Sequence, residues 1–275
     1  MCALLPDLCA AFERGFEKPV ETDPQCWAKN ALSKALVTLG HTESALFLRG
    51  LEHVQMEPVW GGEEDAAATL RGTCALALVS ASDLPRRETL RCLVQALTDR
   101  AASVRLDAVR ALEQMQGEEV ALLLRLKART GDAELAVVGQ VFDSLLTIED
   151  TAAIPFVADF MRHSDEQTGV EAALSLGACR IATAIESLEA AWRKMRNPVV
   201  SAAILRGMSA SRQEQAIEFL LNLLGTARER DALSALDALE LHRFDEDLRA
   251  RIAAAVATRT ETEIQKSFAE RFATD

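Results

Sequence analysis

A short stretch near residue 60 combines residue types that bind partners and ligands in other proteins. Trp60 is one of 3 tryptophans in the chain, and it precedes the only Gly-Gly pair. Arginine, histidine and glutamate side chains stand close before it, where they could form hydrogen bonds beside an aromatic surface. The candidate binding residues of this stretch and of the two predicted helices before it are Trp27, Arg49, His53, Gln55, Glu57 and Trp60. An alternative is that Trp60 only covers the adjoining core.

A second candidate is a basic stretch from residue 86 to residue 129. It holds nine Lys and Arg residues against six Asp and Glu residues, in a chain whose net charge is −12. Arginines aligned on successive helices could bind phosphate groups, and the candidates for that role are Arg86, Arg87, Arg91, Arg105 and Arg110. The alternative is that they pair with acidic residues of neighbouring turns, which is common on helical surfaces. No aromatic residue lies between them to stack on bases.

Signatures of catalysis are absent from the sequence. It holds no GxGxxG, no phosphate-binding P-loop, no GxSxG and no HExxH. The four histidines lie far apart. His41 with Glu43 and His53 with Glu57 could gather around a metal, because their helices are neighbours, but no further ligand pattern supports such a site. We therefore expect no catalytic residues, no bound metal and no cofactor, and a chain that is not an enzyme.

The overall charge and hydropathy narrow the classes of partner and location. An acidic chain weighs against general binding to nucleic acid or to anionic membranes, although a local basic patch is compatible with it. No apolar run reaches the length of a membrane span, and the first residues lack the basic segment of a secretory signal. The 6 cysteines have irregular spacing and no CxxC. These features predict a cytoplasmic protein with reduced cysteines.

An internal repeat of helical segments organises most of the chain. The composition favours helices, with 13 Gly, 7 Pro and no Tyr, in a sequence rich in Ala and Leu. One apolar position recurs at steps of 42, 34, 33, 31, 32 and 31 residues. A small residue precedes it each time, which would let neighbouring helices approach closely. We call these recurring positions the anchors: Leu36, Leu78, Leu112, Leu145, Leu176, Met208 and Leu239.

A second helical pattern lies between successive anchors, so the repeat predicts stacked pairs of helices. A single pair cannot bury its apolar faces, but a stack of pairs can. We expect an all-α fold, an α-solenoid of about seven helix pairs forming a single domain over residues 1–275. Residues 1–21 and 259–275 would form helical caps around repeats in 22–258. The long first step contains an insertion of about ten residues near 55–65, which we expect to be a loop.

The repeat resembles a known type. Asp99, Val104-Arg105, Ala108 and Ala111-Leu112 follow the pattern of the short HEAT-like repeats of bacterial proteins, the type also found in phycobilisome lyase subunits. The resemblance implies an α-solenoid but not one function, because such repeats serve many roles. We expect a non-enzymatic scaffold that binds a protein or peptide on one face. The alternatives are a nucleic-acid binder using residues 86–129, as in HEAT-like DNA glycosylases, and a chromophore-lyase-like role with a small ligand near Trp27 and Trp60.

Overall fold

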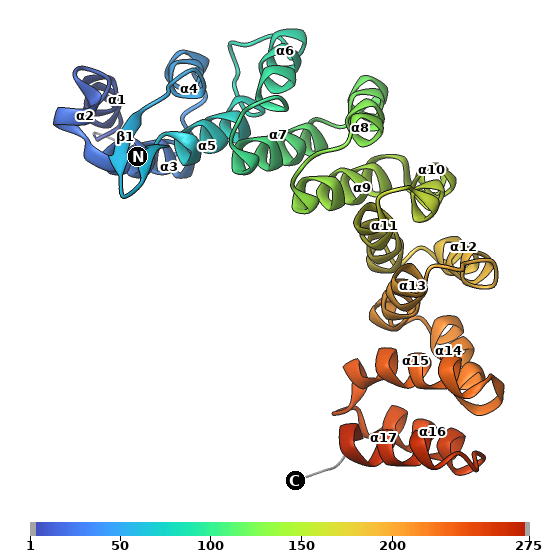
Figure 1. The fold of residues 1–275 in the computed structure, drawn as a ribbon. Helices are drawn as coiled ribbons and strands as arrows, with labels where there is room; N and C mark the ends of the chain where they lie inside the picture. The colour runs from blue at the N-terminus through green and yellow to red at the C-terminus, as the bar shows by residue number, and fades with distance from the viewer. Residues whose placement is uncertain (1–3, 273–275) are drawn as a thin grey trace. The chain divides into compact units, whose positions relative to one another are not determined.

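The computed structural model describes residues 4–272, and most of them lie in α-helices (Figure 1). The predicted all-α fold class is therefore confirmed. The chain divides into two units, Met1–Ser144 and Leu145–Asp275, and we describe each by itself. Helix α9 (Leu135–Glu149) carries the chain from the first unit into the second.

The first unit is a stack of helices with a β-hairpin inserted in it. Its elements in chain order are α1 (Leu5–Arg14), α2 (Pro19–Thr22), the 3-10 turn η1 (Pro24–Cys26), α3 (Trp27–Thr38), α4 (Ser44–Leu51), β1 (Met56–Val59), β2 (Gly62–Asp65), α5 (Ala68–Leu78), α6 (Arg86–Ala96), α7 (Ala102–Met115) and α8 (Glu118–Thr130). Helices α3, α5 and α7 pack on one another in turn. Helices α4, α6 and α8 form a second row beside them (Figure 1).

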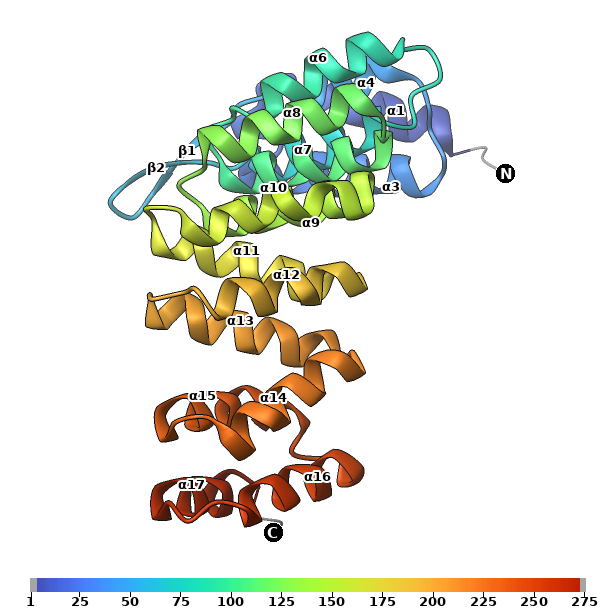
Figure 2. The ribbon, with the colours of Figure 1, turned by 90° about the vertical axis from the view of Figure 1, so that its right-hand side faces the viewer.

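The second unit repeats the same two-row arrangement. Its elements after α9 are η2 (Asp150–Ala153), α10 (Ile154–Asp159), η3 (Phe160–Arg162), α11 (Glu166–Ala178), α12 (Ala182–Trp192), α13 (Pro198–Ser211), α14 (Glu214–Thr226), α15 (Glu229–Leu239), η4 (Glu240–His242), α16 (Glu246–Ala257) and α17 (Thr262–Phe272). Helix α11 packs on α13, α13 on α15 and α15 on α17, and α12, α14 and α16 lie beside them (Figure 2). This stacking of pairs is that of an α-solenoid.

The anchors predicted from the repeat lie on successive helices of the first row. All seven anchors are buried. The small residues before them are buried too, except that Ala35 is half-buried. Between α11 and α13 the two backbones come so close that a Cβ on Gly177 would overlap the carbonyl oxygen of Gly207. Gly207 is one of the small residues that precede an anchor, so the interpretation that small residues permit close approach is confirmed for the pair α11 and α13.

The expected caps are helical where the structure describes them. Helix α1 packs on α3, and α17 packs on α15 and α16. The outermost cap residues, 1–3 and 273–275, lie outside the described part of the chain. Within that part, α3/α4 through α15/α16 follow one another as seven helix pairs in chain order, as the repeat predicts. A single domain over 1–275 stays a prediction.

The insertion near residue 60 is not the loop that we expected, but a hairpin. Strand β1 pairs antiparallel with β2, and Val59 faces Gly62 across a two-residue turn. Gly61 in that turn has a φ of +95°, a backbone conformation that suits glycine. Each strand has only four residues, which is too short to reveal a strand by its alternation of side chains.

Candidate functional site

The hairpin, residues Met56–Asp65, is anchored to the helices by one buried carboxylate. Glu57 is 5% exposed and accepts hydrogen bonds from the backbone N–H of Gln25 at 2.7 Å and from its side-chain Nε2 at 2.9 Å. The Nε2 of Gln55, a residue only 1% exposed, donates to Glu57 at 2.5 Å and to the carbonyl of Asp23 at 2.8 Å. These bonds connect β1 to the segment that leads into α3.

A second carboxylate, the half-buried Asp65, holds the other end of the hairpin. It accepts from the backbone N–H groups of Gln55 and Ala67, both at 3.1 Å, and forms an ion pair with Arg71 of α5 at 2.7 Å. The same guanidinium, 3% exposed, binds Asp99 in the next repeat at 2.7 Å. Burial would lower the pKa of Arg71, but its hydrogen bonds to these two carboxylates outweigh burial and raise it. The hairpin is thus fixed at its base to two successive repeats.

The tip of the hairpin carries a fully solvated aromatic side chain. Trp60 stands in the turn and is 97% exposed, and Figure 2 shows the hairpin extending beyond the helices of its unit. The alternative that Trp60 covers the core disagrees with this exposure. Trp27, the first residue of α3, is 75% exposed. Trp27 lies two residues after Gln25, which donates to Glu57. The buried Glu57 carboxylate therefore helps to position the backbone near both tryptophans.

The remaining two candidate residues lie below the hairpin. The ring of His53 is half-buried, its Nε2 lies 3.1 Å from Oε1 of Gln55, and it packs edge-on against Phe16. Burial lowers the pKa of His53, although its hydrogen bond with Gln55 acts in the opposite direction. The Arg49 guanidinium is exposed and lies over the Phe16 ring, 4.5 Å from its centroid. Of the six predicted residues, Gln55 and Glu57 are therefore buried and His53 is half-buried. The other three, Trp27, Arg49 and Trp60, are exposed.

Acidic side chains surround the exposed tip. Residues 52–65 include five Asp and Glu residues and no Lys or Arg. Glu57 and Asp65 are used inside the fold, whereas Glu63 and Glu64 on β2 are exposed. The surface beside Trp60 is therefore aromatic and negative, which suits a positively charged partner.

The arginines of the basic stretch have acceptors within the fold. Arg105 binds Asp132 through two hydrogen bonds, at 2.6 and 2.7 Å, and occupies the same place in its repeat as Arg71. Burial would raise the pKa of Asp132, but hydrogen bonds from Arg105 and Lys127 outweigh it and hold the pKa well below its usual range. This pairing agrees with the alternative that the arginines pair with acidic residues, but the partner of Arg105 lies in the next repeat and not in a neighbouring turn, so the pair joins successive repeats.

The other four candidate arginines also lie beside carboxylates. On α6, Arg86 binds Glu119 at 2.7 Å, while Arg87 and Arg91 lie 3.4 and 2.8 Å from Glu88. Each of these three guanidinium groups therefore already has an acidic partner within the fold. On α7, Arg110 lies 3.2 Å from Asp107. A phosphate-binding role for these arginines stays a prediction, and the structure offers no unpaired guanidinium in the set of five.

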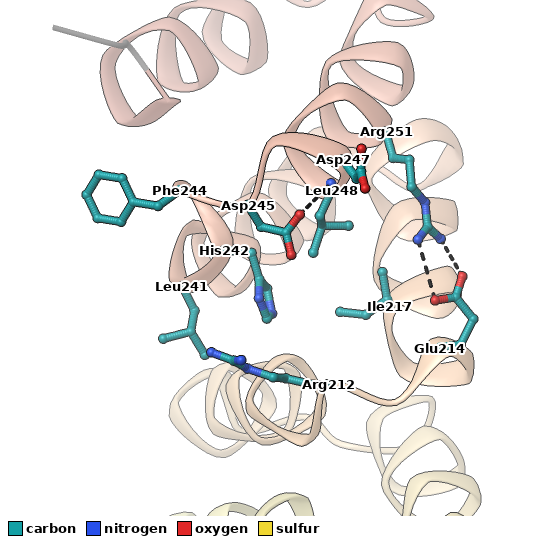
Figure 3. A pocket seen from close by; sticks show the side chains of 10 residues that line it. All are labelled: Arg212, Glu214, Ile217, Leu241, His242, Phe244, Asp245, Asp247, Leu248 and Arg251. Carbon is teal, nitrogen blue, oxygen red and sulfur yellow. Dashed lines mark hydrogen bonds and ion pairs between the residues drawn. The ribbon is translucent and has the colours of Figure 1, made fainter.

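The second unit has a hollow of about 500 Å³ between α14 and α16 (Figure 3). Its charged groups mostly bind one another or the backbone: Arg251 binds Glu214 at 2.7 Å, and Asp245 accepts the N–H of Leu248. The buried ring of His242 lies at 3.0 Å from the carbonyl of Ser209. Because these side chains already bind one another or the backbone, they stabilise the fold and leave few donors or acceptors for a ligand.

Within residues 4–272, no group of three or more His, Cys, Asp and Glu side chains is placed to hold a metal ion. The cysteines of that part of the chain are free thiols, and burial raises the pKa of Cys26 to about 11 and that of Cys74 to about 12. No helix of the described part is both long and apolar enough to cross a membrane.

Comparison with known proteins adds two similar solved structures. No family profile and no curated protein matches the sequence. The complex of CpcE and CpcF of phycocyanin lyase from Nostoc sp. PCC7120 is 18% identical, covers 94% of this chain and 95% of its own, and has a TM-score of 0.45. The structure of YibA of Escherichia coli is 14% identical, covers 99% and 97%, and has a TM-score of 0.46. The solenoid fold class itself rests on the stacked helix pairs described above.

Proposed function

We propose that this protein is a non-enzymatic binding module that recognises a basic surface of another protein through the Trp60 hairpin. The observation that carries the proposal is a tryptophan 97% exposed on a turn whose base is fixed by buried polar groups. Exposed tryptophan is a frequent centre of binding energy in protein interfaces. A fixed hairpin also presents it without a large entropic cost on binding.

The charge around the hairpin supports a basic partner. Glu63 and Glu64 stand exposed beside the turn, and residues 52–65 contain no Lys or Arg that would repel a cationic surface. Lysine and arginine side chains can bind the face of an indole ring as well as nearby carboxylates. Trp27 adds a second exposed ring on the same unit.

Photo-cross-linking from the hairpin tests this proposal. Trp60 is replaced by p-benzoylphenylalanine, the variant is irradiated in extract of the native cell, and the cross-linked peptides are sequenced. Leu126 on α8, which is also exposed, provides the control position. We expect discrete products from position 60 but not from position 126, on segments rich in Lys and Arg.

Two further variants make the result decisive. In the purified complex, Trp60→Ala should weaken binding by about 2 kcal/mol or more, roughly thirtyfold, without lowering the melting temperature, since the side chain packs on nothing in the free protein. The double change Glu63→Gln with Glu64→Gln should reduce both the affinity and its dependence on salt. Equal cross-linking from both positions, or full binding by Trp60→Ala, would contradict the proposal.

A further inference from the structure

The second unit carries a hollow of about 390 Å³ that the sequence analysis did not single out. It is formed by the start of α13, the start of α15 and the connection that follows α12. The lining residues that matter for its chemistry are Trp192, Arg193, Arg196, Ser201, Arg230 and Ser234. All of them belong to the same unit, so the hollow is a feature of that unit alone.

Positive charge in this hollow is not balanced. Three guanidinium groups line it against the single carboxylate of Asp231, in a chain whose net charge is −12. Arg193 is paired with Glu189 of its own helix at 3.0 Å. Arg196 and Arg230 are exposed, and within residues 4–272 neither has a carboxylate at ion-pair distance.

The hollow of Figure 3 provides the contrast. There, Arg251 binds both Glu214 and Glu218, at 2.7 and 2.6 Å, so its charge is already neutralised. Among the described residues, Arg196 and Arg230 have no such partner, so both guanidinium groups can pair with a carboxylate from outside, and bidentate pairing of that kind is one of the strongest hydrogen-bonded contacts. The two unpaired arginines therefore offer donors to an external oxyanion.

The helices that form the hollow favour the same ligand. Both α13 and α15 direct their positive N-terminal ends to it, and the N-cap residue of α15, Arg228, offers no side-chain acceptor to that helix. On α13, Asn197 already accepts the N–H groups of Val199 and Val200. The dipoles of both helices favour an anion here, although Asp231 in the first turn of α15 opposes part of that effect.

A groove with two aromatic rings in its lining adjoins the charged hollow. Trp192 packs edge-on against Phe219, with ring centroids 5.6 Å apart. Both rings line a groove of about 680 Å³ together with Leu221 and Leu223, and polar side chains, among them Glu189 and Glu218, complete its lining. Because Trp192 and Arg193 line both hollows, a ligand in the charged hollow can place an apolar group in the groove without a break between the two.

We propose that the charged hollow and the adjoining groove together bind an acidic peptide segment. Two Asp or Glu carboxylates of the segment pair with Arg196 and Arg230, and an apolar side chain close to them lies against Trp192. The site is independent of the Trp60 hairpin, which stands in the other unit and carries the opposite charge. One protein could therefore hold a basic and an acidic partner segment at the same time.

The test uses a peptide array and one reporter protein. In the array, hexapeptides carry two fixed Asp residues and all residue types at the other positions, and matched hexapeptides carry Asn instead. The reporter has the changes Trp27→Phe and Trp60→Phe, so Trp192 is its only tryptophan. The strongest binder is then titrated while the fluorescence of Trp192 is followed.

We expect Asp peptides with a neighbouring Leu or Phe to bind and to change the Trp192 emission. Each of Arg196→Ala and Arg230→Ala should weaken binding about tenfold or more, as expected for loss of a charged hydrogen-bonded contact. The control Arg87→Ala, an exposed arginine of the other unit, should leave binding unchanged. Circular dichroism would confirm that all variants remain folded.

Three results would overturn the proposal. The first is an array in which no Asp peptide binds more tightly than its Asn counterpart. The second is unchanged affinity after both arginines are replaced. The third is binding of phosphorylated peptides alone, with none by the Asp series, because it would assign the hollow to phosphate and not to carboxylate.

Discussion

Replacing Glu57 by alanine tests the claim that a buried carboxylate holds the Trp60 hairpin in place. The change removes the acceptor for two donors of Gln25 and one of Gln55. The side chain of Gln25 is exposed and can bond to water instead, so the cost comes from two donors, the Gln25 backbone N–H and the Gln55 amide. A buried donor without an acceptor costs about 1–3 kcal/mol, which gives about 2–4 kcal/mol for the pair after partial relaxation.

Hydrogen exchange measures that loss where it occurs. The chain has two units, so one global unfolding free energy would not isolate the hairpin. We expect the amides of residues 56–65 and 24–28 to exchange about 30- to 1,000-fold faster in Glu57→Ala, the factor that corresponds to 2–4 kcal/mol of local opening. Amides of α7 and α8 should exchange at the rate of the unchanged protein.

Glu64→Ala provides the matched control. Glu64 lies directly opposite Glu57 in the strand register but is exposed, so its removal should change the local exchange by less than about threefold. If Glu57→Ala exchanges like Glu64→Ala over residues 56–65, the carboxylate does not anchor the hairpin and the reasoning is wrong.

Three further predictions concern the stack itself. Gly177→Ala should destabilise the second unit by about 1–3 kcal/mol, because the added Cβ would overlap a carbonyl of α13. A Cβ at Gly225 meets nothing closer than 3.8 Å, so Gly225→Ala should not lower the melting temperature. Equal effects of the two changes would refute the close approach of α11 and α13. Arg71→Ala should cost about 3–5 kcal/mol in denaturant titrations, since it removes a buried guanidinium from two carboxylates whose side chains are only 9% and 16% exposed. Arg87→Ala should cost less than about 0.5 kcal/mol; similar costs would show that the Arg71 pairs do not join the repeats. Burial would raise the pKa of Asp99, but hydrogen bonds from Arg71 and the backbone outweigh it and lower the pKa. The ionised Asp99 side chain therefore stabilises the fold fully above about pH 4, and this stabilisation is lost as the pH falls further. A melting temperature that stays constant from pH 5 to pH 2 would contradict this.

The helix stack was predictable because its signal is local and repeated. Each anchor, such as Leu112 on α7, combines an apolar residue with a small neighbour at a helical spacing. The exact contact between Gly177 and Gly207 was not predictable, since it depends on how closely α11 and α13 pack. The Arg–Asp pairs do have a signal in the sequence, because Asp65 precedes Arg71 by the same spacing as Asp99 precedes Arg105.

The candidate site was predictable only in part. Trp60 beside two glycines marked the insertion, but a strand with one buried side chain, Glu57, has no alternating pattern to detect. The sequence also could not distinguish the buried Gln55 and Glu57 from the exposed tryptophans, because that division arises when β1 meets the segment before α3. Arg196 and Arg230 stand far apart in the chain, and only the stacking of α13 on α15 brings them to one hollow.

Fluorescence quenching of Trp60 tests the central claim most directly. In a variant with Trp27→Phe and Trp192→Phe, Trp60 is the only tryptophan, and acrylamide should quench it almost as strongly as free tryptophan because the ring is 97% exposed. Addition of the partner identified by cross-linking should reduce quenching to the level of a buried ring if the hairpin is the binding surface. Quenching that stays unchanged in the complex would contradict the account, because the partner would then bind without covering Trp60.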